Sequence, residues 1–480
     1  MKTPILGSAY VARSVNAADN RMVNLFPEIV PEGGKEPAFL QRAPGLEFLQ
    51  TIGTGPIRGL WAHQTNGTDF YVVSGSGFYK LTGPTAAPTF IGEVTGTGPV
   101  TIADNGIQLF IACNPDGFIY NEQTDVFQQI TDEDFPGAVT VAYLDGYFVF
   151  NEPNSQKIWV TALLDGTSVD PLEFASAEGS PDGVVAVFVD HRELWVFGTD
   201  TTEVWYNAGA TDFPLLRIQG AFNEVGCVAA NSIAKMDNQI FWLGTDARGQ
   251  GMVYRASGYI GQRISTHAIE WQIQQYSDLS DATGYTYQQD GHSFYVLNLP
   301  SANTTWVFDA ATGVWHERAA FDNGNFYRHR ADNMCNFEGS IIVGDYENGN
   351  LYQFNLNMFA DNGGPQKWLR SWRALPTGEN SLARTLHHGM QLDCESGVGL
   401  NTGQGSDPQV MLRWSDDAGH TWSNEHWRSM GRIGRYGHRV IWWRLGATTK
   451  LRDRVYEVSG TDPVRIFITG AELLLSGTRA

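Results

Sequence analysis

Residues 190–206 read DHRELWVFGTDTTEVWY, and this stretch contains two short apolar runs separated by polar turn residues. The turn signal Asp190-His191 precedes Leu194-Trp195-Val196-Phe197, and Glu203-Val204-Trp205-Tyr206 follows a few residues later. Short runs of β-branched and aromatic residues bounded by turn residues are typical of β-hairpins. This stretch therefore predicts two antiparallel strands, each too short to be stable without neighbours.

The same pattern recurs about every 40 to 50 residues between residues 51 and 356. First strands of the repeats follow turns such as Asn105-Gly106, Asp145-Gly146, Asp237-Asn238 and Asp290-Gly291. No window of 12 residues has helical periodicity. Four short strands per repeat is the blade of a β-propeller, in which face-to-face packing buries the sheets and leaves only short edges. We therefore predict an all-β fold with a six- or seven-bladed propeller over residues 51–356.

Composition supports a packed protein and argues against several classes of function. The chain of 480 residues is 42% hydrophobic and 12% aromatic, which is ample for a core and excludes disorder. Its net charge of −20 argues against a DNA-gripping surface. No run of 18 apolar residues or secretory signal is visible, so we expect no membrane-spanning segment. The four cysteines form no CxxC pair, which indicates free thiols in a reducing cytosol. The 15 tryptophans are interpreted first as filler between blades.

Two flanking segments differ from the repeats. Residues 1–50 contain Pro27, Pro31, Pro37 and Pro44, and we expect an N-terminal arm with little regular structure, held down by the last blade or a neighbouring subunit. Residues 357–370 are a predicted linker, flexible at Asn362-Gly363-Gly364-Pro365. Residues 371–480 have net charge +2, whereas residues 1–370 have −22. Alternating strands predict a small C-terminal β-sandwich or barrel over 371–480.

The sharpest local motif is an Asp box in the C-terminal domain. Its residues are Ser415, Asp417, Gly419, Thr421 and Trp422. The expected role is structural: Asp417 accepts hydrogen bonds from turn N–H groups, Gly419 takes positive φ, and Trp422 fixes the hairpin to its sheet. The motif resembles that of sialidases, where it repeats across blades, but here it occurs once and outside the propeller.

No arrangement of residues predicts catalysis, a cofactor or a metal. Asp132, Glu133 and Asp134 share one acidic loop, which is interpreted as solvated rather than as a glycosidase pair. His387 and His388 are adjacent, so on a strand they point to opposite faces. We therefore expect no catalytic, cofactor-binding or metal-binding residues.

A basic run extends from Trp427 to Arg454. Its first five arginines, a predicted docking surface, are Arg428, Arg432, Arg435, Arg439 and Arg444. Nucleic-acid contact is one interpretation. A polar sheet face or a protein–protein contact, in which arginine is enriched, is the interpretation that the acidic chain favours.

Motifs at both ends resemble a known family. The N-terminal motif comprises Asn24, Pro27, Glu28, Pro44, Gly45 and Leu46, and the C-terminal stretch includes Trp414 to Trp422, Trp427-Arg428 and Arg439 to Gly446. Together they resemble the packaged-DNA stabilization proteins of short-tailed bacteriophages, the tail hub or nozzle subunits. The resemblance covers about 110 residues at the two ends, and the middle is similar only as a degenerate propeller.

The resemblance implies a non-enzymatic component of the virion tail, assembled in the host cytoplasm. Family members form a ring, commonly of six copies, below the portal and its adaptor ring. The ring closes or extends the DNA channel, retains packaged DNA and carries tail fibres, spikes or a needle. No catalytic residues belong to the family. DNA would pass the lumen without specific binding.

Two hypotheses and two alternatives follow. An acidic lumen would repel phosphate and keep DNA mobile. The second hypothesis is that the Pro-rich arm, residues 1–45, or the C-terminal domain makes inter-subunit contacts. If the arm does so, deleting residues 1–45 should leave a folded monomer that cannot join the tail. The alternatives are a glycan- or receptor-binding propeller of the tail, with exposed aromatics on one face, and a propeller glycosidase with a carboxylate pair in its central pocket.

Overall fold

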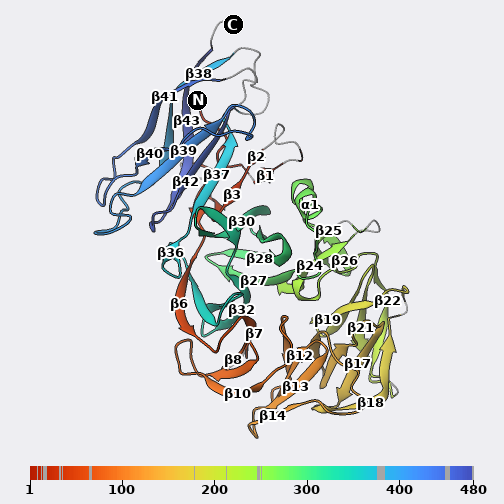
Figure 1. The fold of residues 1–480 in the computed structure, drawn as a ribbon. Coiled ribbons are helices and arrows are strands. Elements are labelled where there is room, and N and C mark those ends of the chain that lie inside the picture. Colours follow the sequence, from red (N-terminus) through yellow and green to blue (C-terminus); the bar gives the residue numbers. More distant parts are fainter. Residues whose placement is uncertain are drawn as a thin grey trace.

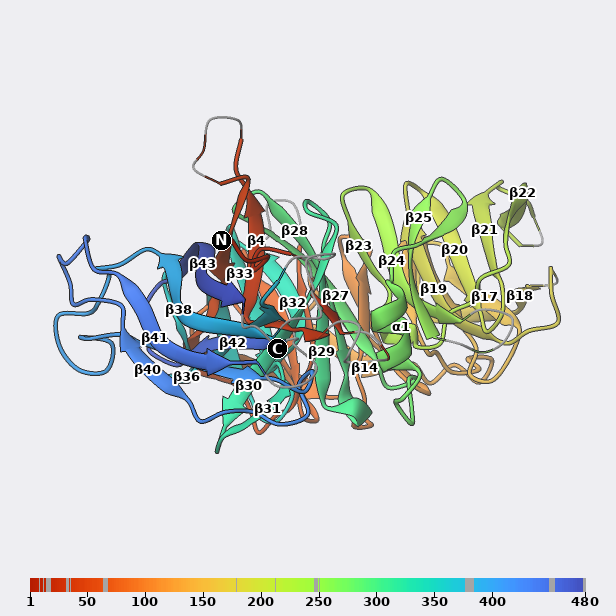
Figure 2. The same ribbon diagram turned by 90° about the horizontal axis from the view of Figure 1, so that it is seen from above.

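The structure is a computed structural model of an all-β chain with a propeller and a C-terminal sandwich side by side (Figures 1 and 2). It describes residues 1–7, 9–11, 13, 19–31, 34, 36–63, 68–177, 179–211, 213–245, 249, 251–375, 384–448 and 454–477. Among these residues the helices are α1 (His267–Ile273) and two short 3-10 turns, η1 (Ala230–Ser232) and η2 (Pro300–Ala302). The predicted fold class, a β-propeller with a small β-sandwich, agrees with this architecture.

Five four-stranded antiparallel sheets follow one another in chain order from residue 57 to residue 263. Their strands are β7 (Ile57–Ala62), β8 (Phe70–Ser74), β9 (Gly77–Leu81) and β10 (Thr89–Glu93); β11 (Thr101–Asp104), β12 (Gln108–Cys113), β13 (Asp116–Asn121) and β14 (Val126–Gln129); β15 (Val141–Leu144), β16 (Tyr147–Asn151), β17 (Lys157–Ala162) and β18 (Asp165–Ser176); β19 (Val184–Asp190), β20 (Glu193–Gly198), β21 (Thr202–Asn207) and β22 (Leu215–Asn223); and β23 (Ala234–Met236), β24 (Gln239–Thr245), β25 (Gly251–Ser257) and β26 (Ile260–Arg263).

Two further sheets complete the ring, and the last of them takes a strand from the N-terminal segment. The sixth comprises β27 (Thr283–Gln289), β28 (His292–Leu299), β29 (Thr304–Asp309) and β30 (Val314–Asp322), with β31 (Asn325–Arg328) paired to β30. The seventh comprises β32 (Ala331–Phe337), β33 (Ser340–Asp345), β34 (Asn350–Asn355) and β6 (Gly45–Thr51). Strand β7 packs against both β11 and β32, so the first and last sheets are neighbours and the ring closes (Figure 1).

The turns within the blades have the geometry that their sequences predict. Asp145-Gly146 and Asp290-Gly291 each have two successive positive φ values, 49° and 100° in the first and 52° and 78° in the second. Tight hairpin turns of this type require positive φ at both central residues, which favours Asp-Gly and Asn-Gly. The hairpin predictions at these positions are therefore explained by turn chemistry.

Aromatic side chains fill the spaces between neighbouring sheets. Trp242 of the fifth blade is fully buried in a cluster with Trp195 and Phe197 of the fourth. Trp315 of the sixth blade is buried against Phe241 of the fifth. Burying one such ring stabilises the fold by several kcal/mol before conformational entropy is counted, about 25 cal/mol for each Å². These tryptophans are filler between blades, as predicted.

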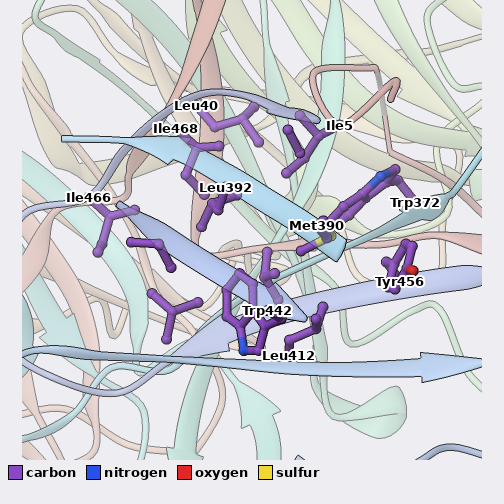
Figure 3. Packing of buried hydrophobic residues seen from close by; sticks show 14 of the residues in the cluster. Ile5, Leu40, Trp372, Met390, Leu392, Leu412, Trp442, Tyr456, Ile466 and Ile468 are labelled. Carbon is purple, nitrogen blue, oxygen red and sulfur yellow. The ribbon is translucent and has the colours of Figure 1, made fainter. Parts of the chain in front are cut away.

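The sandwich consists of two sheets with one shared apolar core. One sheet contains β37 (Trp368–Arg373), β42 (Val455–Gly460), β39 (Gln409–Ser415) and β40 (His426–Ser429). The other contains β4 (Leu25–Ile29), β5 (Ala38–Arg42), β43 (Phe467–Gly477), β38 (Thr385–Cys394) and β41 (Val440–Ala447). Trp372, Met390 and Trp442 meet Leu40 and Ile5 in the core between them (Figure 3). The N-terminal segment is therefore part of the sandwich.

One sheet runs without interruption from the propeller into the sandwich. The strand β3 (Met22–Val23) pairs in parallel with β30 at Val23 and Glu317, and antiparallel with β37 through Met22 and Arg370. The hydrogen-bonded order is β27-β28-β29-β30-β3-β37-β42-β39-β40. A two-residue strand from the N-terminal segment thus joins the sixth blade to the sandwich.

The N-terminal segment differs from the expected irregular arm. Residues 22–51 contain β3, β4, β5 and β6, and β1 (Tyr10–Val11) pairs with β2 (Asp19–Asn20). The prolines do not interrupt these strands because Pro27 lies on β4, an edge strand with one partner, and Pro31 and Pro37 lie in the β4–β5 loop. The segment is held by both domains of its own chain.

The predicted linker differs from a flexible connection as well. Strands β35 (Ala360–Asp361) and β36 (Gly364–Pro365) form a hairpin, with positive φ at Asn362 and Gly363. Asp361 also pairs in parallel with Leu46 of β6. The Asn-Gly signal therefore marks a tight turn, and this hairpin packs beside the last blade.

Candidate functional site

Asn24, a residue of the predicted N-terminal motif, lies inside the junction between the propeller and the sandwich. Asn24 is fully buried and has a φ of 52°. Its Nδ2 donates to the carbonyls of Ala319 and Lys367, both at 2.8 Å, and its Oδ1 accepts from the Ala319 N–H at 3.0 Å. One side chain thus connects the N-terminal segment, the sixth blade and the segment that leads into the sandwich.

The remaining motif residues hold the same region together. Pro27 lies opposite Leu40 on the β4–β5 hairpin, and Glu28 accepts a hydrogen bond from Gln41 at 2.9 Å. The Pro44 carbonyl accepts from Gln366 at 3.0 Å. A Cβ on Gly45 would lie 2.5 Å from two backbone oxygens, so only glycine fits there. Leu46 is buried in the core of the last two blades. Each residue of the motif thus contributes to strand pairing, hydrogen bonding or packing at the junction.

A buried charge network lies beside this motif at the domain junction. Arg42 donates through Nε to Gln366 Oε1 at 3.1 Å and through an amino group to the carbonyl of Val464 at 2.9 Å. Gln366 in turn donates to Asp361 Oδ1 at 3.2 Å. Burial raises the pKa of the Asp361 carboxyl to about 6, against the opposing charge of Arg42, and lowers the pKa of Arg42 to about 9. The network thus holds the Asp361 carboxyl group in a buried position, where desolvation makes its charged form unfavourable.

Replacement of Asp361 by Asn should change how stability depends on pH. The folded-state pKa of about 6 exceeds the ordinary value of 3.8. Between these values the folded chain keeps a proton that the unfolded chain releases, so stability is full at low pH and declines as pH rises from about 4 to 6. Asp361→Asn removes this decline. By linkage we expect its free energy of unfolding, relative to wild type, to increase by about 3 kcal/mol between pH 4 and pH 7.5.

Urea unfolding at a series of pH values measures this difference. Glu338→Gln is the matched control, because Glu338 is exposed on a propeller turn and its replacement should leave the pH profile unchanged. Parallel profiles for wild type and Asp361→Asn would contradict the prediction.

The Asp box closes the loop after β39 through its own side chains. Asp417 accepts from the Thr421 N–H at 2.8 Å and from the Ser415 hydroxyl at 2.6 Å, and Gly419 has a φ of 94°. These hydrogen bonds to its charged form lower the pKa of Asp417 to about 2, with the bond from Ser415 the largest cause. The Trp422 ring is half-buried, with the Arg413 guanidinium 4.6 Å from its centroid. The arrangement is that of a self-contained turn.

A buried ion pair next to the box was not predicted from the sequence. Arg454, at the end of the basic run, is buried and donates to both carboxylate oxygens of Asp416 at 2.7 and 2.8 Å. It also donates to the Leu445 carbonyl at 2.7 Å. Asp416 occupies a variable position of the box, and Arg454 follows several exposed arginines, so no spacing signal distinguished either residue.

The five arginines of the predicted docking surface lie at one edge of the sandwich. Arg428 is on β40, Arg444 is on β41, and Arg432, Arg435 and Arg439 are in the connecting segment. All five are exposed. Arg428 donates to the Ile441 carbonyl at 3.0 Å and Arg439 to the Gln391 side chain at 2.5 Å, but none of the five forms an ion pair with a described carboxylate. The structure thus brings them together.

Large apolar side chains accompany these arginines, which the sequence did not predict. Trp427 is 51% exposed, Tyr436 75% and Trp443 58%, and Ile433 is also exposed. Trp443 lies over Gly389, where a Cβ would be only 2.7 Å from the ring. We call residues 426–447 the sandwich edge. Tryptophan was expected to be filler, and Trp427 and Trp443 are exceptions.

Two cavities are lined by inner strands of the propeller, one of about 470 Å³ and one of about 700 Å³. The first contains Arg58, Asp281, Arg328 and Asp332. Arg58 donates to the carbonyls of Gly98 and Gly75, and Arg328 pairs with Asp332 at 3.1 Å.

In the acidic loop, Asp132 accepts from the N–H groups of Asp134 and Val169, both at 3.1 Å. No three described His, Cys, Asp or Glu side chains are grouped so as to hold a metal ion.

The fold defines the class, which is an all-β protein that combines a propeller with a C-terminal sandwich. The chain belongs to the family of phage P22 Gp10, because the family model described as "Bacteriophage P22 Gp10, beta-propeller" matches residues 1–359. A second model, "Bacteriophage P22 Gp10, beta-sandwich", matches residues 367–475. The predicted resemblance to phage tail hub proteins is confirmed.

One relative matches this chain over nearly the full length of both proteins. The chain is 22% identical over 461 residues to "Tail hub protein gp10" of Salmonella phage P22, covering 89% of this chain and 90% of the relative. Family membership along both domains makes this chain a structural tail hub protein and a component of a phage tail.

Two solved structures match this chain with TM-scores below 0.5. They are the computationally designed Ika8 protein (TM-score 0.40, 12% identity, 65% of this chain and 100% of that chain) and the Mitotic Checkpoint Complex (TM-score 0.42, 10% identity, 69% and 98%). In the part of the chain that the structure describes, helices are too short or too polar to cross a membrane.

Proposed function

We propose that copies of this chain, six by the family resemblance, form a ring in the tail of a short-tailed phage, below the portal and its adaptor ring. The observation that carries this proposal is the match of both domains, in order, to the Gp10 family. The ring extends or closes the DNA channel, retains packaged DNA and anchors fibres, spikes or a needle.

The charge distribution supports a channel that DNA passes without specific binding. Residues 1–370 have a net charge of −22, and an acidic wall repels phosphate, whereas a basic wall would hold it. The propeller cavities, at about 470 and 700 Å³, are on the scale of small-molecule pockets. The DNA path in this proposal therefore lies between subunits, not through the propeller.

The proposed role is non-enzymatic, with assembly in the host cytoplasm. Of the free cysteines, Cys113, Cys227 and Cys335 are buried, which supports folding in a reducing compartment. The comparisons favour neither the glycan- or receptor-binding alternative nor the glycosidase.

Immunoelectron microscopy of purified particles, combined with particles assembled without this chain, tests the proposal. Label between the capsid vertex and the tail tip, together with loss of nuclease-protected DNA from the deficient particles, is the expected result. Label confined to peripheral fibres would favour the receptor-binding role. Deficient particles that keep their full DNA content would overturn the retention role.

A further inference from the structure

The sandwich edge has the composition of a protein-binding surface and no partner within its own chain. Residues 426–447 contain five arginines and no aspartate or glutamate. Trp427, Tyr436 and Trp443 are more than half exposed among them. Tryptophan, tyrosine and arginine are the residues that carry most binding energy at protein interfaces. Strands β40 and β41 lie on the side of the sandwich remote from the propeller (Figures 1 and 2), so the chain's own acidic domain does not neutralise them.

The partner of this surface must be acidic, and one acidic surface is present on every copy of the chain. The first turn of successive propeller sheets places Asp237, Asp290 and Glu338 at one face, because these turns all join an innermost strand to the next. All three side chains are exposed, and none forms an ion pair with a described residue. Asp237 accepts a hydrogen bond from Gln288 at 2.5 Å. We call the three the acidic turn face.

We infer that the sandwich edge of one copy binds the acidic turn face of a neighbouring copy. Two sandwich edges repel each other because both are cationic, so a symmetric contact of the edge with itself is disfavoured. A contact between two different surfaces repeats from copy to copy, and it closes into a ring when the rotation permits. This inference rests on the proposed function and supplies the interface that a ring requires.

The contact combines two kinds of interaction. Arg432 and Arg435 have no side-chain partner among the described residues, so a neighbour's carboxylates supply the charge. Trp443 lies over Gly389, and Leu474 is paired with Gly389 on the next strand, so the two side chains offer an apolar area on the outer face of the sheet at its β41 edge. Charge guides the copies together and sets their orientation, and the apolar contact slows their separation.

Site-specific photo-crosslinking in assembled particles identifies the occupant directly. Tyr436→p-benzoylphenylalanine is introduced into the full chain, particles are irradiated, and the linked peptides are identified by mass spectrometry. We expect crosslinks to a second copy near Asp290 or Glu338. Phe222→p-benzoylphenylalanine is the matched control, because this exposed aromatic lies at the opposite end of its blade from the first turns, and it should not crosslink to these turns.

Every other occupant overturns the inference. If the chain is present in the tail, crosslinks to DNA, crosslinks to a different tail protein or the absence of crosslinks would each overturn the inferred contact. Absence of the chain from particles would instead refute the proposed function, so the two failures are distinguishable.

A charge exchange gives an independent readout. Arg432→Glu with Arg435→Glu should reduce incorporation into particles at least tenfold, and adding Asp290→Lys with Glu338→Lys should restore it. Arg465→Glu, an exposed arginine elsewhere on the sandwich, is the control. Equal incorporation of all variants would contradict the proposed contact.

Discussion

A chain that begins at Thr54 is expected not to fold to the native propeller. Deletion of residues 1–53 removes β6, the outermost strand of the last blade, together with the strand that links the two domains. It also removes fully buried apolar side chains, namely Ile5, Met22, Val23, Leu25, Phe26, Leu40, Leu46 and Ile52. Loss of one large core side chain costs about 2–5 kcal/mol, and total stability is about 5–15 kcal/mol, so the sum exceeds what the fold can lose.

Calorimetry and near-ultraviolet circular dichroism measure the outcome. The truncated chain should show no cooperative unfolding transition and no fixed aromatic environment. Co-expression of residues 1–53 and 54–480 as two fragments is the control, because the split falls in an exposed loop and keeps every strand. The pair should recover the native spectrum. A cooperative transition for 54–480 alone would contradict the structural role of the segment.

This expectation replaces the hypothesis that a chain lacking residues 1–45 is a folded monomer. That hypothesis assumed an arm that projects towards a neighbour. Strand β3 instead pairs with β30 and β37, and β5 pairs with β4 and β43, all within the chain. Failure of a truncated chain to join a tail would therefore report loss of folding and not loss of an inter-subunit contact.

Replacement of Asn24 is expected to be the most damaging single polar substitution. Asn24→Ala removes three hydrogen bonds to backbone groups, two of them buried and one partly buried, at about 1–3 kcal/mol for each buried group. It also places a residue with a Cβ but no compensating hydrogen bond at positive φ, which costs about 1 kcal/mol. We expect a loss of about 4 kcal/mol or more in the free energy of unfolding, visible as a lower midpoint in thermal or urea unfolding.

Two companion variants separate the contributions. Asn24→Gly tolerates the backbone conformation and should recover about 1 kcal/mol relative to Asn24→Ala. Asn238→Ala is the matched control, because Asn238 has a similar φ of 57° but lies exposed on a propeller turn. Its loss in the free energy of unfolding should stay near the cost of about 1 kcal/mol for the positive φ alone. Equal losses for Asn24→Ala and Asn238→Ala would show that the buried hydrogen bonds contribute nothing.

The parts of the fold that local sequence predicts are those built from neighbours in the chain. Asp145-Gly146 and Asp290-Gly291 define hairpins because turn type and strand register are decided within a few residues. The Asp box is predictable for the same reason, since Ser415, Asp417 and Thr421 bond to one another.

The parts that it does not predict depend on partners far away in the chain. Strand β6 pairs with β34, about 300 residues later, and no local pattern in Gly45–Thr51 specifies that partner. Proline density suggested irregular structure, whereas an edge position makes Pro27 compatible with a strand. At the sandwich edge, the arginines were recognised as part of a basic run. Exposure of Trp427 and Trp443 was not, because tryptophan is more often buried.

The strand β3 gives the molecule a mechanical property. Domains that are joined by a flexible linker turn freely, but here backbone hydrogen bonds continue from β30 through β3 to β37. Bending between the domains would require breaking that ladder and the side-chain bonds of Asn24 beside it. A force applied to the sandwich edge is therefore transmitted to the sixth blade without bending at the junction. In the proposed ring, such stiffness would spread the load of compressed DNA over all subunits instead of concentrating it at one joint.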